Sequence, residues 1–119
     1  MIALSELHWA AGFMEGEGSF GFYRNAKGPR LMMSCAQVCQ EPIERLKALF
    51  GGNSRLQEMA APRQAIWKWQ VYGVRAAAGM MTLYSLMAPR RKGQIEQALE
   101  GWRTVRVRRG PVWEELQCA

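Results

Sequence analysis

The stretch Trp9-Ala10-Ala11-Gly12-Phe13-Met14-Glu15-Gly16-Glu17-Gly18 combines very small residues with two acids. Gly12 and Gly16 stand four residues apart, so they share one face of a helix and let a second helix backbone approach closely. The last two glycines indicate that the helix stops here, which places Glu15 and Glu17 at its C-terminus. The helix dipole disfavours anions there by up to about 1 kcal/mol. The two acids therefore predict a nearby cation, the alternative being a solvated turn with incidental acids.

Length and composition describe one globular domain. The chain has 119 residues, which is enough for a real core, and 49% of them are hydrophobic, which is too many for a disordered chain. A formal net charge of +6 favours a polyanionic partner, most commonly nucleic acid. A basic protein without a nucleic-acid role fits the same charge.

The three cysteines, Cys35, Cys39 and Cys118, are an odd number. Without a secretion signal, this predicts reduced thiols in an intracellular compartment, either cytoplasmic or organellar. His8 and one pair of cysteines do not complete a zinc ligand set. The N-terminus shows no basic region followed by an apolar run, and nothing reaches transmembrane length, so neither a signal peptide nor a membrane partner is expected.

Four helices are expected from periodicity and end signals. Ser5 suits an N-cap for the first, and Pro42 suits the first position of the second, which Gly51-Gly52 terminates. Pro89 separates the third helix from the fourth, which opens with a basic run. The expected helices cover residues 6–16, 42–50, 74–87 and a stretch from 90 onward.

Four strands are expected at residues 19–24, 30–40, 53–59 and 65–72. Phe20 and Phe22 share one face of the first strand, and Trp67 and Trp69 share one face of the last. In the second strand both alternating sets are similarly apolar, which leaves its register open. The order of elements predicts an α+β fold with helices on one face of an antiparallel sheet.

The other face of this sheet is then free and carries polar, partly basic side chains. A twisted sheet of this kind fits the major groove of DNA, where Gln and Arg read base edges and Lys and Arg contact phosphates. An ordinary solvated sheet face is the alternative. The side chains expected to contact DNA are Tyr23, Asn25, Arg30, Met33, Cys35, Gln37, Arg55, Gln57, Lys68 and Gln70.

Residues 10–18 resemble the nine-residue motif of the LAGLIDADG homing endonucleases. They match it at Ala11, at Gly12 and Gly18, and at the two acidic positions, Glu15 and Glu17. The element order extends the resemblance over about residues 5–104, which leaves 105–119 as the tail of a single domain spanning 1–119. The resemblance implies an αββαββα half, whose antiparallel sheet forms a DNA-binding saddle with the helices on its other face.

Only one motif occurs, because the second small-residue run, Ala76–Met81, contains no acid. A single-motif member of the family is expected to be a homodimer in which the motif helices of two chains pack together. A two-fold dimer implies a palindromic or pseudo-palindromic target. The expected interface residues are Trp9, Ala10, Gly12, Phe13 and Gly16.

The activity implied is that of a meganuclease, a site-specific endonuclease of intron homing that hydrolyses both DNA strands with Mg²⁺. Glu17 matches the metal-binding acid of the motif, with the neighbouring Gly16 as a second metal contact. Mg²⁺ suits hard carboxylate oxygens and borrows phosphate ligands, and Ca²⁺ is expected to occupy such a site without supporting cleavage. Glu15 matches an acid that the family uses structurally.

Three further positions match the family's catalytic surroundings. Gln40 corresponds to a residue that orders water near the metal. The basic residue near the scissile phosphate corresponds to Arg91 by spacing and to Lys92 by residue type. Glu44 departs from the pattern, since the family often has a basic residue there.

Two other functions stay open. One is a non-cleaving DNA- or RNA-binding protein on the same scaffold, such as an intron maturase or a transcription regulator. The other is a basic dimeric interaction module without nucleic acid. The intact Glu17 favours the nuclease, because a protein that no longer cuts has no need of an acid beside phosphates.

Overall fold

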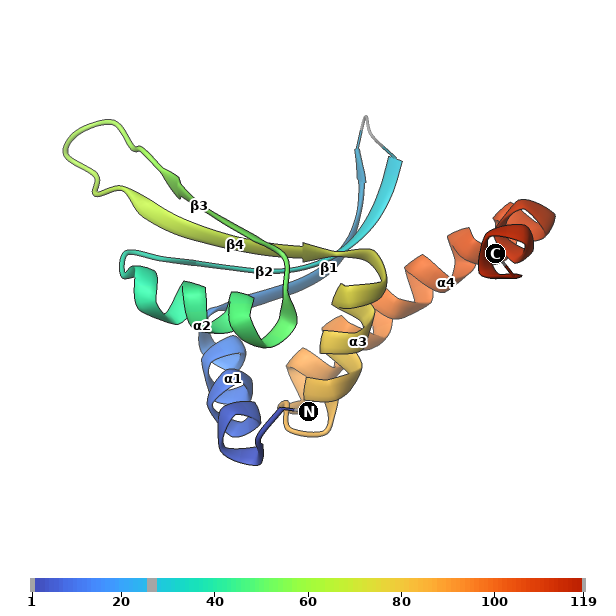
Figure 1. Ribbon diagram of the computed structural model, residues 1–119, viewed down its shortest axis with the longest axis horizontal. Helices are drawn as coiled ribbons and strands as arrows, with labels where there is room; N and C mark the ends of the chain where they lie inside the picture. Colours follow the sequence, from blue (N-terminus) through green and yellow to red (C-terminus); the bar gives the residue numbers. More distant parts are fainter. Residues whose placement is uncertain (1, 26–27, 119) are drawn as a thin grey trace.

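The computed structural model of the chain describes residues 2–25 and 28–118, and the side chains of 2–24 and 28–105. Helices and strands follow one another in the expected order (Figure 1). The elements are α1 (Leu4–Glu17), β1 (Gly18–Asn25), β2 (Gly28–Gln37), α2 (Gln40–Phe50), β3 (Asn53–Gln57), β4 (Ile66–Tyr72), α3 (Gly73–Tyr84) and α4 (Pro89–Cys118).

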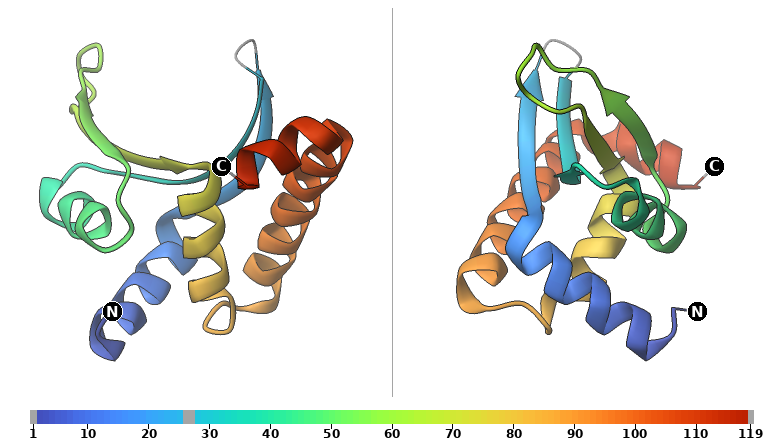
Figure 2. Two further views of the ribbon diagram at one scale, coloured as in Figure 1. Left: turned by 45° about the vertical axis from the view of Figure 1, so that its right-hand side comes forward. Right: turned by 90° about the vertical axis from the view of Figure 1, so that its left-hand side faces the viewer.

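The four strands form one antiparallel sheet in the order β1-β2-β4-β3. The sheet is strongly curved, and the strand pairs β1–β2 and β3–β4 rise on opposite sides of its concave face (Figure 2, left). The helices α1, α2 and α3 lie below the sheet, and no element covers the concave face in the described part of the chain (Figures 1 and 2). The expected α+β architecture, with a saddle-like sheet and helices on one side, is confirmed.

Strand register decides which side chains face the helices. Met33 of β2 lies opposite Phe20 of β1 and Val71 of β4, and Cys35 lies opposite Trp69. Directly opposed residues of antiparallel strands point to the same side of a sheet. The side of β2 that carries Met33 and Cys35 is therefore the helix side.

This register corrects the sequence interpretation of β2. Met33 is 0% exposed and Cys35 is also buried, so neither reaches the concave face where we expected DNA contacts. Gln37 lies opposite Trp67 on the same helix side, and its assignment to the concave face is likewise wrong. The large aromatic side chains of β1 and β4 require apolar partners, and Met33 and Cys35 supply them.

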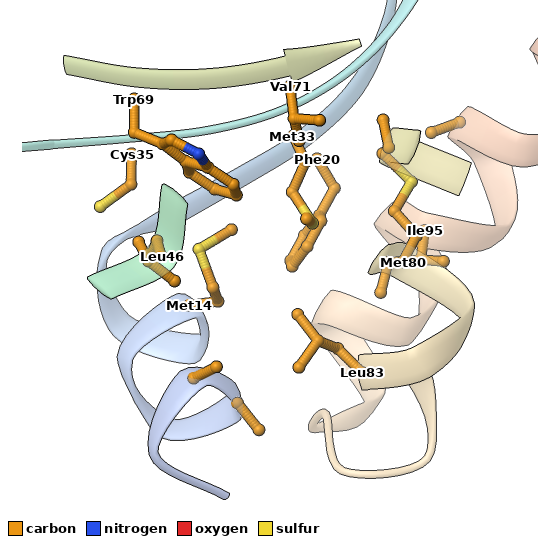
Figure 3. Close-up of a cluster of buried hydrophobic side chains, with 14 of the residues drawn as sticks. Met14, Phe20, Met33, Cys35, Leu46, Trp69, Val71, Met80, Leu83 and Ile95 are labelled. Carbon is orange, nitrogen blue, oxygen red and sulfur yellow. The ribbon is translucent and has the colours of Figure 1, made fainter. Parts of the chain in front are cut away.

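The core fills the space between the sheet and the helices (Figure 3). Trp69 is fully buried in it, and its indole N–H donates a 2.8 Å hydrogen bond to the backbone carbonyl of Gly51, where α2 ends. One side chain thus joins β4 to the end of α2. Other fully buried members include Met14, Leu31, Met33, Ile43, Leu46, Val71, Met80, Leu83 and Ile95.

Several element ends differ from expectation. Ser5 does not cap α1, which begins at Leu4 after Ala3, because the backbone bond from Leu7 N to Ala3 O, 3.0 Å long, closes the first turn without a side chain. Gln40 opens α2 instead of ending β2, so this helix starts two residues before Pro42. Residues 105–118, expected to form a tail, continue α4 as helix.

None of the helices in the described part of the chain is both long and apolar enough to cross a membrane.

Candidate functional site

Glu17 is the last residue of α1, and β1 begins directly after it. Its side chain is exposed and lines an open hollow of about 360 Å³ on the sheet. The other walls come from β1, β2 and β4 and include Ser19, Ser34, Lys68 and Gln70. The end of the motif helix therefore delivers a carboxylate to the surface formed by the strands.

The carboxylate of Glu17 also acts on the core beneath it. Burial, and after it the negative charge of Glu17, raises the pKa of the Cys35 thiol to about 11. Cys35 lies opposite Gly18 in the β1–β2 ladder, which explains why this thiol feels the charge.

The described residues of the chain do not form a complete metal site by themselves. Among the described residues, no three His, Cys, Asp or Glu side chains gather closely enough to hold a metal ion. A single exposed carboxylate at a helix C-terminus nevertheless offers hard oxygen ligands in a place where the dipole favours a cation. Glu17 and the adjoining Gly16 carbonyl fit Mg²⁺ if further ligands come from a second chain, water and phosphate.

Glu15, in contrast, is engaged by the protein. Its carboxylate Oε1 accepts a 2.7 Å hydrogen bond from the backbone N–H of Ala88, just before α4. Its backbone carbonyl accepts a 3.0 Å hydrogen bond from Arg91 Nε, and its Oε2 lies 3.9 Å from the same nitrogen. These contacts agree with the structural role that we expected for Glu15.

The same contacts correct the expectation for Arg91. Its side chain is buried, since the residue is only 7% exposed, and its Nη1 donates a 2.9 Å hydrogen bond to Gln94 Oε1. The guanidinium also lies 5.9 Å from the centre of the Phe20 ring. A guanidinium held by Glu15, Gln94 and Phe20 inside the protein does not present itself to a phosphate.

The two remaining catalytic candidates lie away from the hollow. Lys92 Nζ is 5.5 Å from the centre of the Tyr84 ring, at the corner between α3 and α4. Gln40 is exposed at the first turn of α2. Neither is among the residues that line the hollow beside Glu17, so the structure does not bring these candidates together.

The concave face carries most of the remaining predicted contacts. Tyr23 lies opposite Arg30, and Arg55 lies opposite Lys68, so each pair points away from the helices. The register places Gln57 and Gln70 on the same face, whereas the side chain of Asn25 lies outside the described residues. Sequence reasoning missed Met32, Ser34 and Ala36 on this face because the register of β2 was open. It also did not name three members on the other strands, Ser19, Asn53 and Tyr72.

The face of α1 that carries the glycines is open. A Cβ atom built on Gly12 or Gly16 would meet nothing within 4 Å. Ala10 is 0% exposed within the protomer, which corrects its assignment to an interface between chains. Trp9 and Phe13 are partly buried and stack on each other with ring centres 5.3 Å apart.

No family model and no curated protein matches the sequence. Solved structures do match. The archaeal intron-encoded homing endonuclease I-Vdi141I, complexed with DNA, is 18% identical with a TM-score of 0.55, over 73% of this chain and 60% of its own. I-TnaI is 13% identical with a TM-score of 0.59, over 87% of this chain and 74% of its own.

The LAGLIDADG homing endonuclease I-LtrWI, bound to its target DNA, is 15% identical with a TM-score of 0.63, over 89% of this chain but only 39% of its own. The chain thus spans about 60% of the length of I-Vdi141I and less than half of I-LtrWI. At these identities the likeness concerns the fold. The saddle-like sheet, the helix ending in Glu15 and Glu17, and these matches together show that the chain has the fold of the LAGLIDADG homing endonucleases.

Proposed function

We propose that the protein is a Mg²⁺-dependent DNA endonuclease that binds a palindromic or pseudo-palindromic duplex as a homodimer and cuts both strands. The single observation that carries this proposal is the position of Glu17. Its carboxylate lines the same hollow as Lys68 and Gln70, so the acid and the strand side chains face one shared surface. I-Vdi141I and I-LtrWI, which share the fold, are bound to DNA in their structures.

The charges of the concave face support a polyanionic ligand. Arg55 and Lys68 lie directly opposite each other on β3 and β4. Like charges in this relation destabilise a sheet by up to about 1 kcal/mol, so a ligand that neutralises both gains that energy on binding. The net charge of +6 acts in the same direction, and DNA phosphates are the matching polyanion.

The exposed carboxylate of Glu17 supports metal-assisted hydrolysis. When bound, Mg²⁺ would polarise the scissile phosphate and lower the pKa of the attacking water. The role of Glu17 is to hold the ion beside the DNA strand that lies over the hollow. Since one chain offers too few ligands, the second copy of Glu17 would come from the partner chain.

The cleavage test compares Glu17→Gln with Glu100→Gln. Glu100 lies on α4 in an exposed ion pair with Arg103, so its substitution makes the same chemical change away from the hollow. On duplexes that the wild type selects and cuts with Mg²⁺, Glu17→Gln should bind but lose cleavage by at least about a hundredfold, while Glu100→Gln should cut normally. Cleavage by Glu17→Gln at the wild-type rate would refute the assignment.

The homodimer has its own test. The open surroundings of Gly12 leave room within the protomer for a larger side chain, so Gly12→Leu should fold. The same side chain would block close approach of a second α1, and the variant should sediment as a monomer where the wild type sediments as a dimer. Gly93→Leu, on α4 and equally open, is the matched control. A dimeric Gly12→Leu would contradict packing through this face.

One observation favours the second candidate, a DNA- or RNA-binding protein that does not cut. Arg91 is buried against Glu15, and the Lys92 ammonium group lies over the Tyr84 ring, so neither of the two expected basic residues lines the hollow. Without these two cations, the stabilisation of negative charge in the transition state at the hollow depends on Lys68. Sequence-specific binding by the wild type without any cleavage in Mg²⁺ would establish this alternative.

A further inference from the structure

Three side chains on the concave face form a continuous row. Arg30 Cζ lies 5.0 Å from the centre of the Tyr72 ring, and the Tyr72 hydroxyl donates a 2.6 Å hydrogen bond to Gln70 Oε1. Arg30 comes from β2, and the other two come from β4. We call this set the Arg30–Tyr72–Gln70 row.

The hydrogen bond from Tyr72 orients the Gln70 amide. The hydroxyl donates to Gln70 Oε1, so the oxygen end of the amide faces Tyr72. The nitrogen end, with two N–H donors, is directed away from Tyr72, and Gln70 lines the hollow beside Glu17.

The row consequently presents donors. An arginine side chain has five N–H donors and no acceptor. One of the two lone pairs of Gln70 Oε1 accepts the Tyr72 hydrogen bond, and this contact turns the amide nitrogen with its two N–H donors away from Tyr72. The row thus offers N–H groups from Arg30 at one end and from Gln70 at the other.

We propose that the Arg30–Tyr72–Gln70 row makes the protein select guanine at the base that faces Gln70. Guanine shows two acceptors, N7 and O6, in the major groove, which matches a donor surface. Adenine is usually bound by a glutamine that also accepts from N6, and here that N6–H would share Oε1 with the Tyr72 hydroxyl. This inference rests on the proposed binding of DNA to the concave face, but not on cleavage.

The test is a binding selection from a fully randomised duplex library, with Ca²⁺ in place of Mg²⁺, followed by sequencing. Tyr72→Phe keeps the ring beneath Arg30 and releases Gln70 Oε1. At the position of the selected site where the wild type prefers guanine, its preference for guanine over adenine should fall by about tenfold. Tyr84→Phe removes a hydroxyl that is bonded to Glu96 on the helix side and should keep the wild-type preference.

A second variant reverses the chemistry. Gln70→Glu replaces the outward amide N–H groups by an acceptor oxygen, so the same position should change from guanine toward cytosine, whose N4 is a donor. Sequence-specific binding with the same base preference in wild type, Tyr72→Phe and Gln70→Glu would overturn the inference and leave the proposed function standing. If the wild type binds no duplex at all, the proposed function and this inference both fail.

Discussion

Arg91 Nε donates a 3.0 Å hydrogen bond to the backbone carbonyl of Glu15 and thereby joins the first turn of α4 to the last turn of α1. A cation at this end of a helix is favourable, because the last carbonyl groups carry partial negative charge. The carboxylate of Glu15 is held in addition by the N–H of Ala88. The two acids of the motif therefore have separate tasks: Glu15 anchors the helix end, and Glu17 stays exposed beside the hollow.

The first prediction concerns this anchor. Arg91→Met removes the buried guanidinium and leaves the Glu15 carbonyl and Gln94 Oε1 without their donor. Losing hydrogen bonds to a buried charged group should lower the free energy of unfolding by about 2 kcal/mol. Urea denaturation, followed by circular dichroism, measures the change.

Arg103→Met is the matched control on the same helix. Its ion pair with Glu100 is exposed, with 74% and 66% of the two side chains accessible, and such pairs contribute less than about 1 kcal/mol. If both variants lose the same stability, Arg91 does not anchor α1.

The sequence was sufficient to predict the strands that carry bulky aromatic side chains on one face. Phe20 and Phe22 on β1, and Trp67 and Trp69 on β4, leave no choice about which face meets the helices. The resemblance to the motif also implied different roles for Glu15 and Glu17, and the contacts of Glu15 with Ala88 and Arg91 agree with a structural role for Glu15. These two strands and this helix end determine most of the candidate site.

The register of β2 could not be predicted in the same way. Its two alternating sets, one with Met32 and Ala36 and the other with Met33 and Cys35, are similar in apolarity. Pairing with β1 on one side and β4 on the other decides between them, and such pairing is not visible along one strand. The burial of Arg91 depends in the same way on how α4 packs against α1.

The second prediction concerns salt. If Arg55 and Lys68 contact phosphates, binding to a selected duplex should weaken steeply as salt rises. Because the proposed homodimer carries two copies of each residue, Arg55→Ala should reduce the slope of log K against log salt concentration by about 1.8, which is about 0.9 for each lost phosphate contact, and Lys68→Ala should do the same. Fluorescence anisotropy of a labelled duplex over a salt series provides the slopes.

Arg75→Ala serves as the control for these two variants, because Arg75 lies on α3 beside Gly51, on the helix side of the sheet. Its slope should equal that of the wild type. Equal slopes for all three variants would exclude Arg55 and Lys68 from phosphate contact.

The third prediction concerns pH. Arg45 donates two hydrogen bonds to Glu6, of 2.9 and 2.7 Å, and ties α2 to α1. The hydrogen bond from Arg45 holds the pKa of Glu6 below its ordinary value of 4.5. The folded protein therefore binds this proton less readily than the unfolded chain, so the pair stabilises the fold above about pH 4.5 and stops doing so as the pH falls through the lower folded pKa.

Glu6→Gln should consequently be less stable than the wild type near about pH 7, and the difference should shrink at about pH 3. Thermal unfolding over this pH range measures it. In an Arg45→Met background, Glu6→Gln should show no such pH dependence. A stability difference that stays constant from neutral to acidic pH would refute the role of this pair.

The fourth prediction uses two glycines with opposite surroundings. Gly52 has a φ of +93°, and a Cβ atom there would collide with the backbone carbonyl of Gln70 and lie 2.9 Å from Val71 Cβ. Gly93 lies within α4, and a Cβ atom there would meet nothing within 4 Å.

Gly52→Ala should therefore lower the free energy of unfolding by about 2 kcal/mol or more, because it combines a left-handed backbone with a clash. Gly93→Ala should raise it by up to about 1 kcal/mol, because alanine loses less backbone entropy in a helix. Chemical denaturation of both variants gives the two signs, and a Gly52→Ala protein as stable as the wild type would show that the turn from α2 into β3 differs from the one described.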